Sequence, residues 1–84
     1  MTAQQWLRHF KGQLNSFSTS HYEMQSGTLQ SVILLREMAI LRRRGTEDER
    51  SQLEPLRRSA VAWYFYFRWR QERPRKFEYY QATF

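Results

Sequence analysis

Six aromatic side chains fall within the seven residues from Trp63 to Trp69. A chain of 84 residues buries only about 60 to 65% of the surface that its unfolded form exposes, so it cannot cover all of these rings by itself. A helix would divide the run into two nearly opposite sides, with Leu56, Ala60, Trp63, Tyr64 and Phe67 on one and Ala62, Phe65, Tyr66 and Trp69 on the other. A helix with two apolar faces needs two partners, and we expect one of them to lie outside the chain.

The length of the chain predicts one domain, residues 1–84, because no second core is available at this size. The chain has no cysteine, which excludes disulfides and cysteine-based zinc sites and leaves hydrophobic packing or oligomerisation to stabilise the fold. Its N-terminus lacks the basic start and apolar stretch of a signal peptide, and charges at Arg36, Glu37 and Arg68 interrupt the longest apolar segments. We therefore expect a soluble, cytoplasmic protein that does not associate with membranes.

The net charge of +6 comes mostly from arginine, because 12 of the 14 cationic residues are arginine and only Lys11 and Lys76 are lysine. The guanidinium group offers a planar fork of donors, stacks on aromatic rings and is weakly hydrated. An arginine bias therefore favours specific contacts with phosphate, carboxylate or aromatic groups over solubility alone. The excess is largest in residues 59–84, which carry five cations against two acids.

The first two predicted helices span residues 3–17 and 28–44. The first has apolar residues at alternating spacings of four and three, with Thr2 as its N-cap: Ala3, Leu7, Phe10, Leu14 and Phe17. The second is apolar around most of its circumference, which is typical of a central helix. Thr28 is its predicted N-cap and Gly45 its stop, and Arg42, Arg43 and Arg44 suit the negative end of its dipole.

A third helix is predicted over residues 53–73. Thr46 to Glu49 and Ser51 to Glu54 both match a capping box, and Pro55 favours the later start because proline fits best in a first turn. Pro74 indicates the end of this helix. The fold class is therefore all-α, a compact three-helix domain whose aromatic C-terminal segment, residues 74–84, packs across the third helix.

The alternative fold is α+β with a C-terminal β-hairpin. Val61, Trp63, Phe65, Phe67 and Trp69 alternate with other residues along the chain, and aromatic residues favour strands. Such a hairpin would turn at residues 71–76 and return through residues 77–84.

The residues that could carry catalysis are few. The chain has two histidines, His9 and His21, and one aspartate, Asp48, which lies in a predicted helix start. A metal site of His9, His21 and Glu23 would lack the ligand spacing of known motifs, and no glycine-rich phosphate loop is present. We expect no catalytic residues, no cofactor and no metal, and hence a protein that is not an enzyme.

The leading functional hypothesis is a protein-interaction module or small regulator that binds a protein partner or a second copy of itself. Trp, Tyr and Arg are enriched at binding hot spots, and three exposed rings would match the largest apolar patch of a typical monomer. The predicted partner-binding residues are Phe65, Tyr66, Trp69, Arg70 and Arg73.

The alternative hypothesis is a nucleic-acid-binding module. Cations interleaved with aromatic rings can contact phosphates while the rings stack on exposed bases. The residues that would serve this role are Arg68, Arg70, Arg73, Arg75 and Lys76, with Trp69 or Tyr66 stacking. No motif of a known nucleic-acid-binding fold accompanies them.

Overall fold

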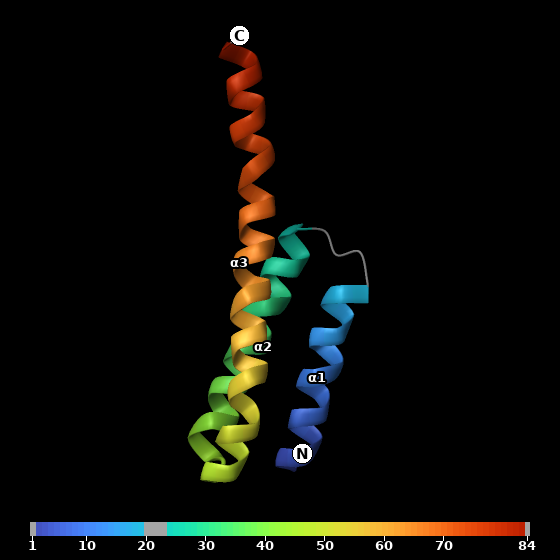
Figure 1. Ribbon diagram of the computed structural model, residues 1–84, viewed down its shortest axis with the longest axis vertical. Helices are drawn as coiled ribbons and strands as arrows, with labels where there is room; N and C mark the ends of the chain where they lie inside the picture. The colour runs from blue at the N-terminus through green and yellow to red at the C-terminus, as the bar shows by residue number, and fades with distance from the viewer. Residues whose placement is uncertain (1, 20–23, 84) are drawn as a thin grey trace.

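Three helices make up the fold: α1 (Ala3–Thr19), α2 (Met24–Arg44) and α3 (Glu47–Thr83). The computed structural model describes the backbone of residues 2–19 and 24–83 and the side chains of residues 2–19 and 26–71. α2 runs antiparallel to α3, and α1 lies alongside them (Figure 1). The predicted all-α class is confirmed. The alternative hairpin is wrong, because residues 61–83 are helical and the described part of the chain contains no strand.

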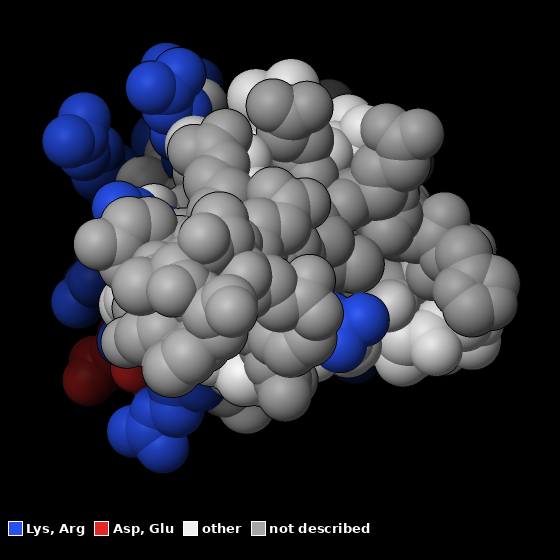
Figure 2. Space-filling view, turned by 90° about the horizontal axis from the view of Figure 1, so that it is seen from above, with Lys and Arg blue, Asp and Glu red and all other residues white. Residues whose placement is uncertain are grey.

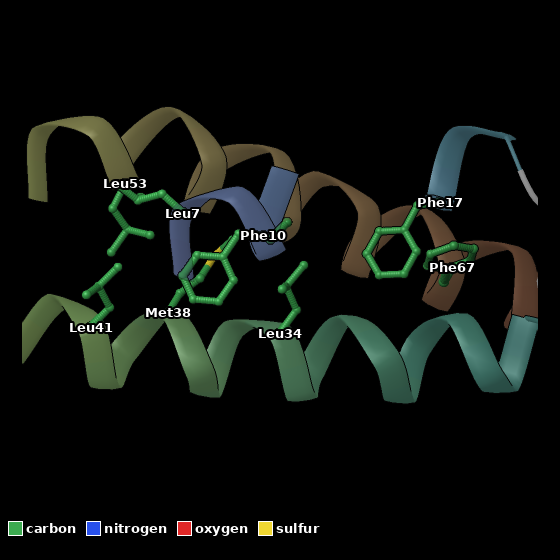
Figure 3. Packing of buried hydrophobic residues seen from close by; sticks show 9 residues of the cluster. Leu7, Phe10, Phe17, Leu34, Met38, Leu41, Leu53 and Phe67 are labelled. Carbon is green, nitrogen blue, oxygen red and sulfur yellow. The ribbon is translucent and has the colours of Figure 1, made fainter. Parts of the chain in front are cut away.

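The core of the bundle follows a seven-residue period on all three helices. Buried or half-buried positions recur at spacings of four and three: Ala3, Leu7, Phe10, Leu14 and Phe17 on α1, Gly27, Ser31, Leu34, Met38 and Leu41 on α2, and Leu53, Leu56, Ala60, Trp63 and Phe67 on α3. This period keeps one seam of each helix facing its neighbours, as in coiled coils. Figure 3 shows the buried members of this set meeting between the helices, among them Leu7, Phe10, Leu34, Met38 and Leu53. Each large apolar side chain buried there contributes about 1.5–3 kcal/mol.

Capping boxes begin both α1 and α3. The Gln5 backbone N–H donates to Thr2 Oγ1 over 3.3 Å, and the Thr2 N–H donates to Gln5 Oε1 over 2.8 Å. Thr46 and Glu49 repeat this arrangement at the start of α3, with distances of 3.3 Å and 2.7 Å. Each box satisfies two backbone donors that a helix start leaves unpaired. The predicted N-cap at Thr2 is confirmed.

α3 begins at Glu47, so its predicted start near residues 52–55 is wrong. The first of the two capping boxes is the one that forms, and Pro55 lies in the third turn. Proline there removes the N–H that would donate to the Ser51 carbonyl. The Pro55 side chain is exposed, so its ring does not disturb the packed face of α3.

α3 also continues past its predicted end at Arg73. Residues 74–83 extend the helix in the same direction, so the prediction that this segment packs back across α3 is wrong (Figure 1). Pro74 lacks only the one backbone hydrogen bond to residue 70, and strong helix formers flank it on both sides. The helix of 37 residues is about 55 Å long at 1.5 Å per residue. The longest dimension of the molecule, 56 Å, matches this length.

α2 begins at Met24, four residues before its predicted N-cap at Thr28. The Thr28 hydroxyl lies inside the helix and donates to Gln71 Oε1 on α3 over 3.3 Å. The buried Ser31 hydroxyl donates to the Thr28 carbonyl over 2.8 Å, so this polar group is satisfied within the seam. α2 ends at Arg44 as predicted, and Gly45 and Thr46 alone connect it to α3.

Candidate functional site

The aromatic face is the name we give to Phe65, Tyr66 and Trp69 on α3. The exposed fractions of these residues are 61%, 43% and 53%, respectively. They lie roughly 120 to 180° around the helix from the buried Ala60, because each residue advances a helix by about 100°. The prediction that a helix places these three rings on the side opposite Phe67 is confirmed, because they are exposed and Phe67 is buried.

Ring contacts connect this face to the core. The ring of the buried Phe67 contacts the ring of Phe17 on α1 edge-on, with 5.4 Å between the ring centroids. It stacks on the ring of Trp63, with 5.6 Å between the centroids. Trp63 in turn contacts Tyr66 at 5.5 Å with its ring at 89°. Such edge-to-face pairs are favourable arrangements of aromatic rings. Tyr66 is therefore held in place from the core side while part of it remains exposed.

Arginines border the aromatic face. Arg58, Arg68 and Arg70 are exposed on α3, and Arg68 Nη1 donates to the Tyr64 hydroxyl over 2.8 Å. Residues 55–71 carry four arginines and no acid. Of the predicted site residues, Phe65, Tyr66, Arg68, Trp69 and Arg70 thus lie close together on one helix. The side chains of the others, Arg73, Arg75 and Lys76, lie outside the described residues.

A second basic surface lies at the end of the bundle where α2 meets α3. Arg42, Arg43 and Arg50, together with Ala39, line an open hollow of about 620 Å³, which we call the arginine hollow. Arg50 Nη2 donates to the Gly45 carbonyl over 3.0 Å, which positions this side chain against the connection. Most of the visible Lys and Arg side chains gather on one side of the molecule (Figure 2).

The arginine hollow was not predicted as a site. From the sequence, Arg42 and Arg43 are expected to compensate the dipole at the end of a helix, and Arg50 has no expected role. The signal that could have located the hollow is the short distance in sequence between these arginines, combined with a tight turn that brings α3 back alongside α2.

Glu54 is the acid that engages the arginines of α3. Arg57 donates to both of its carboxylate oxygens, over 3.1 Å from Nε and 2.7 Å from Nη2, and Arg58 Nε lies 3.6 Å away. These hydrogen bonds, with the positive charges of Arg57, Arg58 and Arg42, hold the pKa of Glu54 below its usual value of 4.5. The carboxylate is therefore ionised and already bound within its own helix.

The side of α2 that faces away from the core carries exposed apolar residues. Leu29, Ile33 and Ile40 are 58%, 41% and 50% exposed, so α2 is not surrounded by its neighbours as a central helix would be. A smaller pocket of about 240 Å³ lies at the N-terminal end of α1, and Ala3, Trp6, Ile40, Leu41, Arg44, Gly45 and Glu49 line it.

His9 is the histidine that the structure describes, and it belongs to no group of possible metal ligands among the described residues. His9 Nε2 lies 3.5 Å from a Glu37 carboxylate oxygen, and its ring contacts Trp6 and Phe10. His21 and Glu23 lie outside the described residues. Among the described residues, no three His, Cys, Asp or Glu side chains are grouped to hold an ion. No helix in that part of the chain has the length and apolar character needed to cross a membrane.

Comparison with known proteins found no matching family model, no matching curated protein and no matching solved structure.

Proposed function

We propose that this chain is a non-enzymatic protein-interaction module that binds a protein partner through the aromatic face of α3. The observation that supports this proposal is the exposure of Phe65, Tyr66 and Trp69 on a helix whose opposite side packs into the described core. The half-buried Trp63 contacts the ring of Tyr66, and the half-buried Tyr64 contacts that of Phe65, so little conformational entropy is lost when these two rings are covered. Aromatic residues and arginine are also the residue types enriched at binding hot spots.

The area of the face fits the centre of an interface. Three aromatic side chains that are each about half exposed leave on the order of 300 Å² of ring surface open. A standard interface covers about 800 Å² on each partner. The three rings therefore supply roughly a third of that area, and the arginines around them supply a polar rim.

The charge of the rim favours an acidic partner over a second copy of the chain. Two copies of this face would bring the exposed Arg68 and Arg70 of one chain near the same arginines of the other. Like charges that face each other across an interface are unfavourable. We therefore propose a partner that presents apolar side chains flanked by Asp or Glu.

Matched variants test this proposal. The variant Phe65→Ala/Trp69→Ala removes two of the rings, and the control Leu29→Ala/Ile33→Ala removes apolar surface from α2. Each protein is used to capture partners from native lysate, and its own mass is measured by light scattering after size exclusion. We expect proteins captured by the wild type and the control to be lost by the ring variant. Truncation of a hot spot weakens binding by at least about 2 kcal/mol, or roughly 30-fold.

Two results would contradict the proposal. Capture of the same proteins by the wild type and the ring variant would exclude the aromatic face as the binding surface. A wild-type dimer that the ring variant converts to a monomer would show that the face binds a second copy. The alternative function, nucleic-acid binding through Arg68, Arg70, Arg73, Arg75 and Lys76, remains a prediction.

A further inference from the structure

Three arginines from two helices line the arginine hollow. Arg42 and Arg43 lie in the last turn of α2, and Arg50 lies in the first turn of α3, across the connection of Gly45 and Thr46. The hydrogen bond from Arg50 to the Gly45 carbonyl holds one wall of the hollow. The turn between the helices thus builds a surface that neither helix has alone.

Three of the acids near the hollow have partners within the chain. Glu54 binds Arg57 and Arg58, Glu49 caps the Thr46 N–H, and Asp48 accepts a hydrogen bond from Gln52 over 3.0 Å. No acid lines the hollow, and Arg42 and Arg43 form no ion pair within the described residues. The charge of Arg42 contributes to the lowered pKa of Glu54, but the absence of a direct ion pair leaves the guanidinium groups of Arg42 and Arg43 able to contact an anion from outside the chain.

The lining identifies the class of ligand. Among the described residues that line it, three are arginines and the fourth is Ala39, whereas the centre of a protein interface is apolar and depleted in charge. Surfaces that bind nucleic acid are more polar and much more positively charged. The hollow is also open, so each contact is screened by water, and a single phosphate would be held weakly. A chain of phosphates overcomes this limit because every neutralised phosphate releases counterions.

We propose that Arg42, Arg43 and Arg50 form a binding site for the phosphate backbone of a nucleic acid. The site is separate from the aromatic face, so the chain would join a protein partner to a nucleic acid. Its contacts reach phosphates and no base edges, so binding is expected to be independent of sequence.

The test measures salt dependence with two probes, a 20-base-pair DNA duplex and a 20-nucleotide oligo-dT strand. The variant is Arg42→Gln/Arg43→Gln, and the control Arg8→Gln/Lys11→Gln removes the same charge from α1. For the duplex, loss of two phosphate contacts lowers the log-log salt slope by about 1.8, and for the single strand by about 1.4. If the variant has a salt slope smaller by about 1.8, a rise from 50 to 200 mM salt weakens its duplex binding about tenfold less than it weakens binding by the wild type. The control is expected to keep the wild-type slope.

The conservative variant Arg42→Lys/Arg43→Lys is expected to restore the slope, and circular dichroism of each variant checks that the helices are intact. Three results would overturn the proposal: no binding of either probe at 50 mM salt, an equal change of slope in the control, or equally tight binding of polyglutamate by the same arginines. The first two exclude the hollow, and the third makes it a general anion site. None of them bears on the aromatic face, which the capture experiment tests separately.

Discussion

The ring of Phe67 occupies the space where a side chain on Gly27 would begin. A Cβ atom built on Gly27 would lie 2.7 Å from Cγ of Phe67, closer than such atoms approach in proteins, and Phe67 is only 2% exposed. Gly27 lies inside α2, where glycine costs about 1 kcal/mol relative to alanine. The residue is required here because it lets α2 and α3 approach closely, although its backbone adopts an ordinary helical conformation.

Gly27→Ala is therefore expected to destabilise the fold despite its better helix propensity. Overpacking of a core costs about 1–3 kcal/mol, which exceeds the gain in propensity. Gly12→Ala is the matched control, because nothing lies within 4 Å of a Cβ at that position, and it should raise the free energy of unfolding by about 1 kcal/mol. Urea denaturation of both variants measures the difference. An increase in stability for both would show that Phe67 can move aside.

Phe67→Ala and Trp69→Ala should separate the two sides of α3. Truncation of the buried Phe67 leaves a cavity and should cost about 3–5 kcal/mol, whereas the half-exposed Trp69 should cost less than about 1 kcal/mol. The free energies of unfolding of the two variants, measured in urea, check this order. A loss of more than 3 kcal/mol at Trp69 would place this ring in the core.

Trp69→Ala should also distinguish the two proposed surfaces. We expect it to abolish capture of the protein partner and to leave the affinity for oligo-dT within about twofold of the wild type, because Trp69 does not line the arginine hollow. If nucleic acid instead binds the C-terminal arginines with its bases stacked on Trp69, the same change should weaken single-strand binding by about 1–3 kcal/mol. Fluorescence anisotropy with a labelled strand measures this affinity.

The ion pair of Glu54 with Arg57 should make stability depend on pH in the acid range. Because the folded-state pKa of Glu54 lies below 4.5, the pair stabilises the fold above that pH and loses this contribution as the pH falls through the folded value. Both Glu54→Gln and Arg57→Gln should reduce the fall in urea midpoint between pH 7 and pH 3. In 1 M salt this difference between wild type and variants should shrink, since the Debye length is then about 3 Å.

The sequence predicts the features that depend on the spacing of residues within one helix. It does not predict the features that depend on how two helices pack against each other. The α1 stripe of Leu7, Phe10 and Phe17 is unambiguous because one face alone is apolar. The start of α3 differs from the prediction because two capping boxes compete in the sequence and the helix accommodates Pro55 in its third turn. The exposure of Phe65 and Trp69 follows from the 3.6 residues per turn of a helix, which place both residues on the side of α3 away from the core.

The arginine hollow could be predicted only from knowledge of how α2 and α3 pack against each other. Arg42 and Arg50 are eight residues apart, and no periodicity within one helix relates them. Likewise, the close approach of Gly27 and Phe67 joins residues 40 positions apart, so only the packed structure shows why that glycine is needed.

The two-residue connection at Gly45 and Thr46 also sets the order in which the chain can fold. Contacts between α2 and α3 begin next to this turn and extend outward from it, so each new pair closes only a short additional loop. Helical proteins dominated by such local contacts fold in microseconds to milliseconds. We expect the α2–α3 hairpin to form first and the docking of α1, which brings Phe17 against Phe67, to complete the native state.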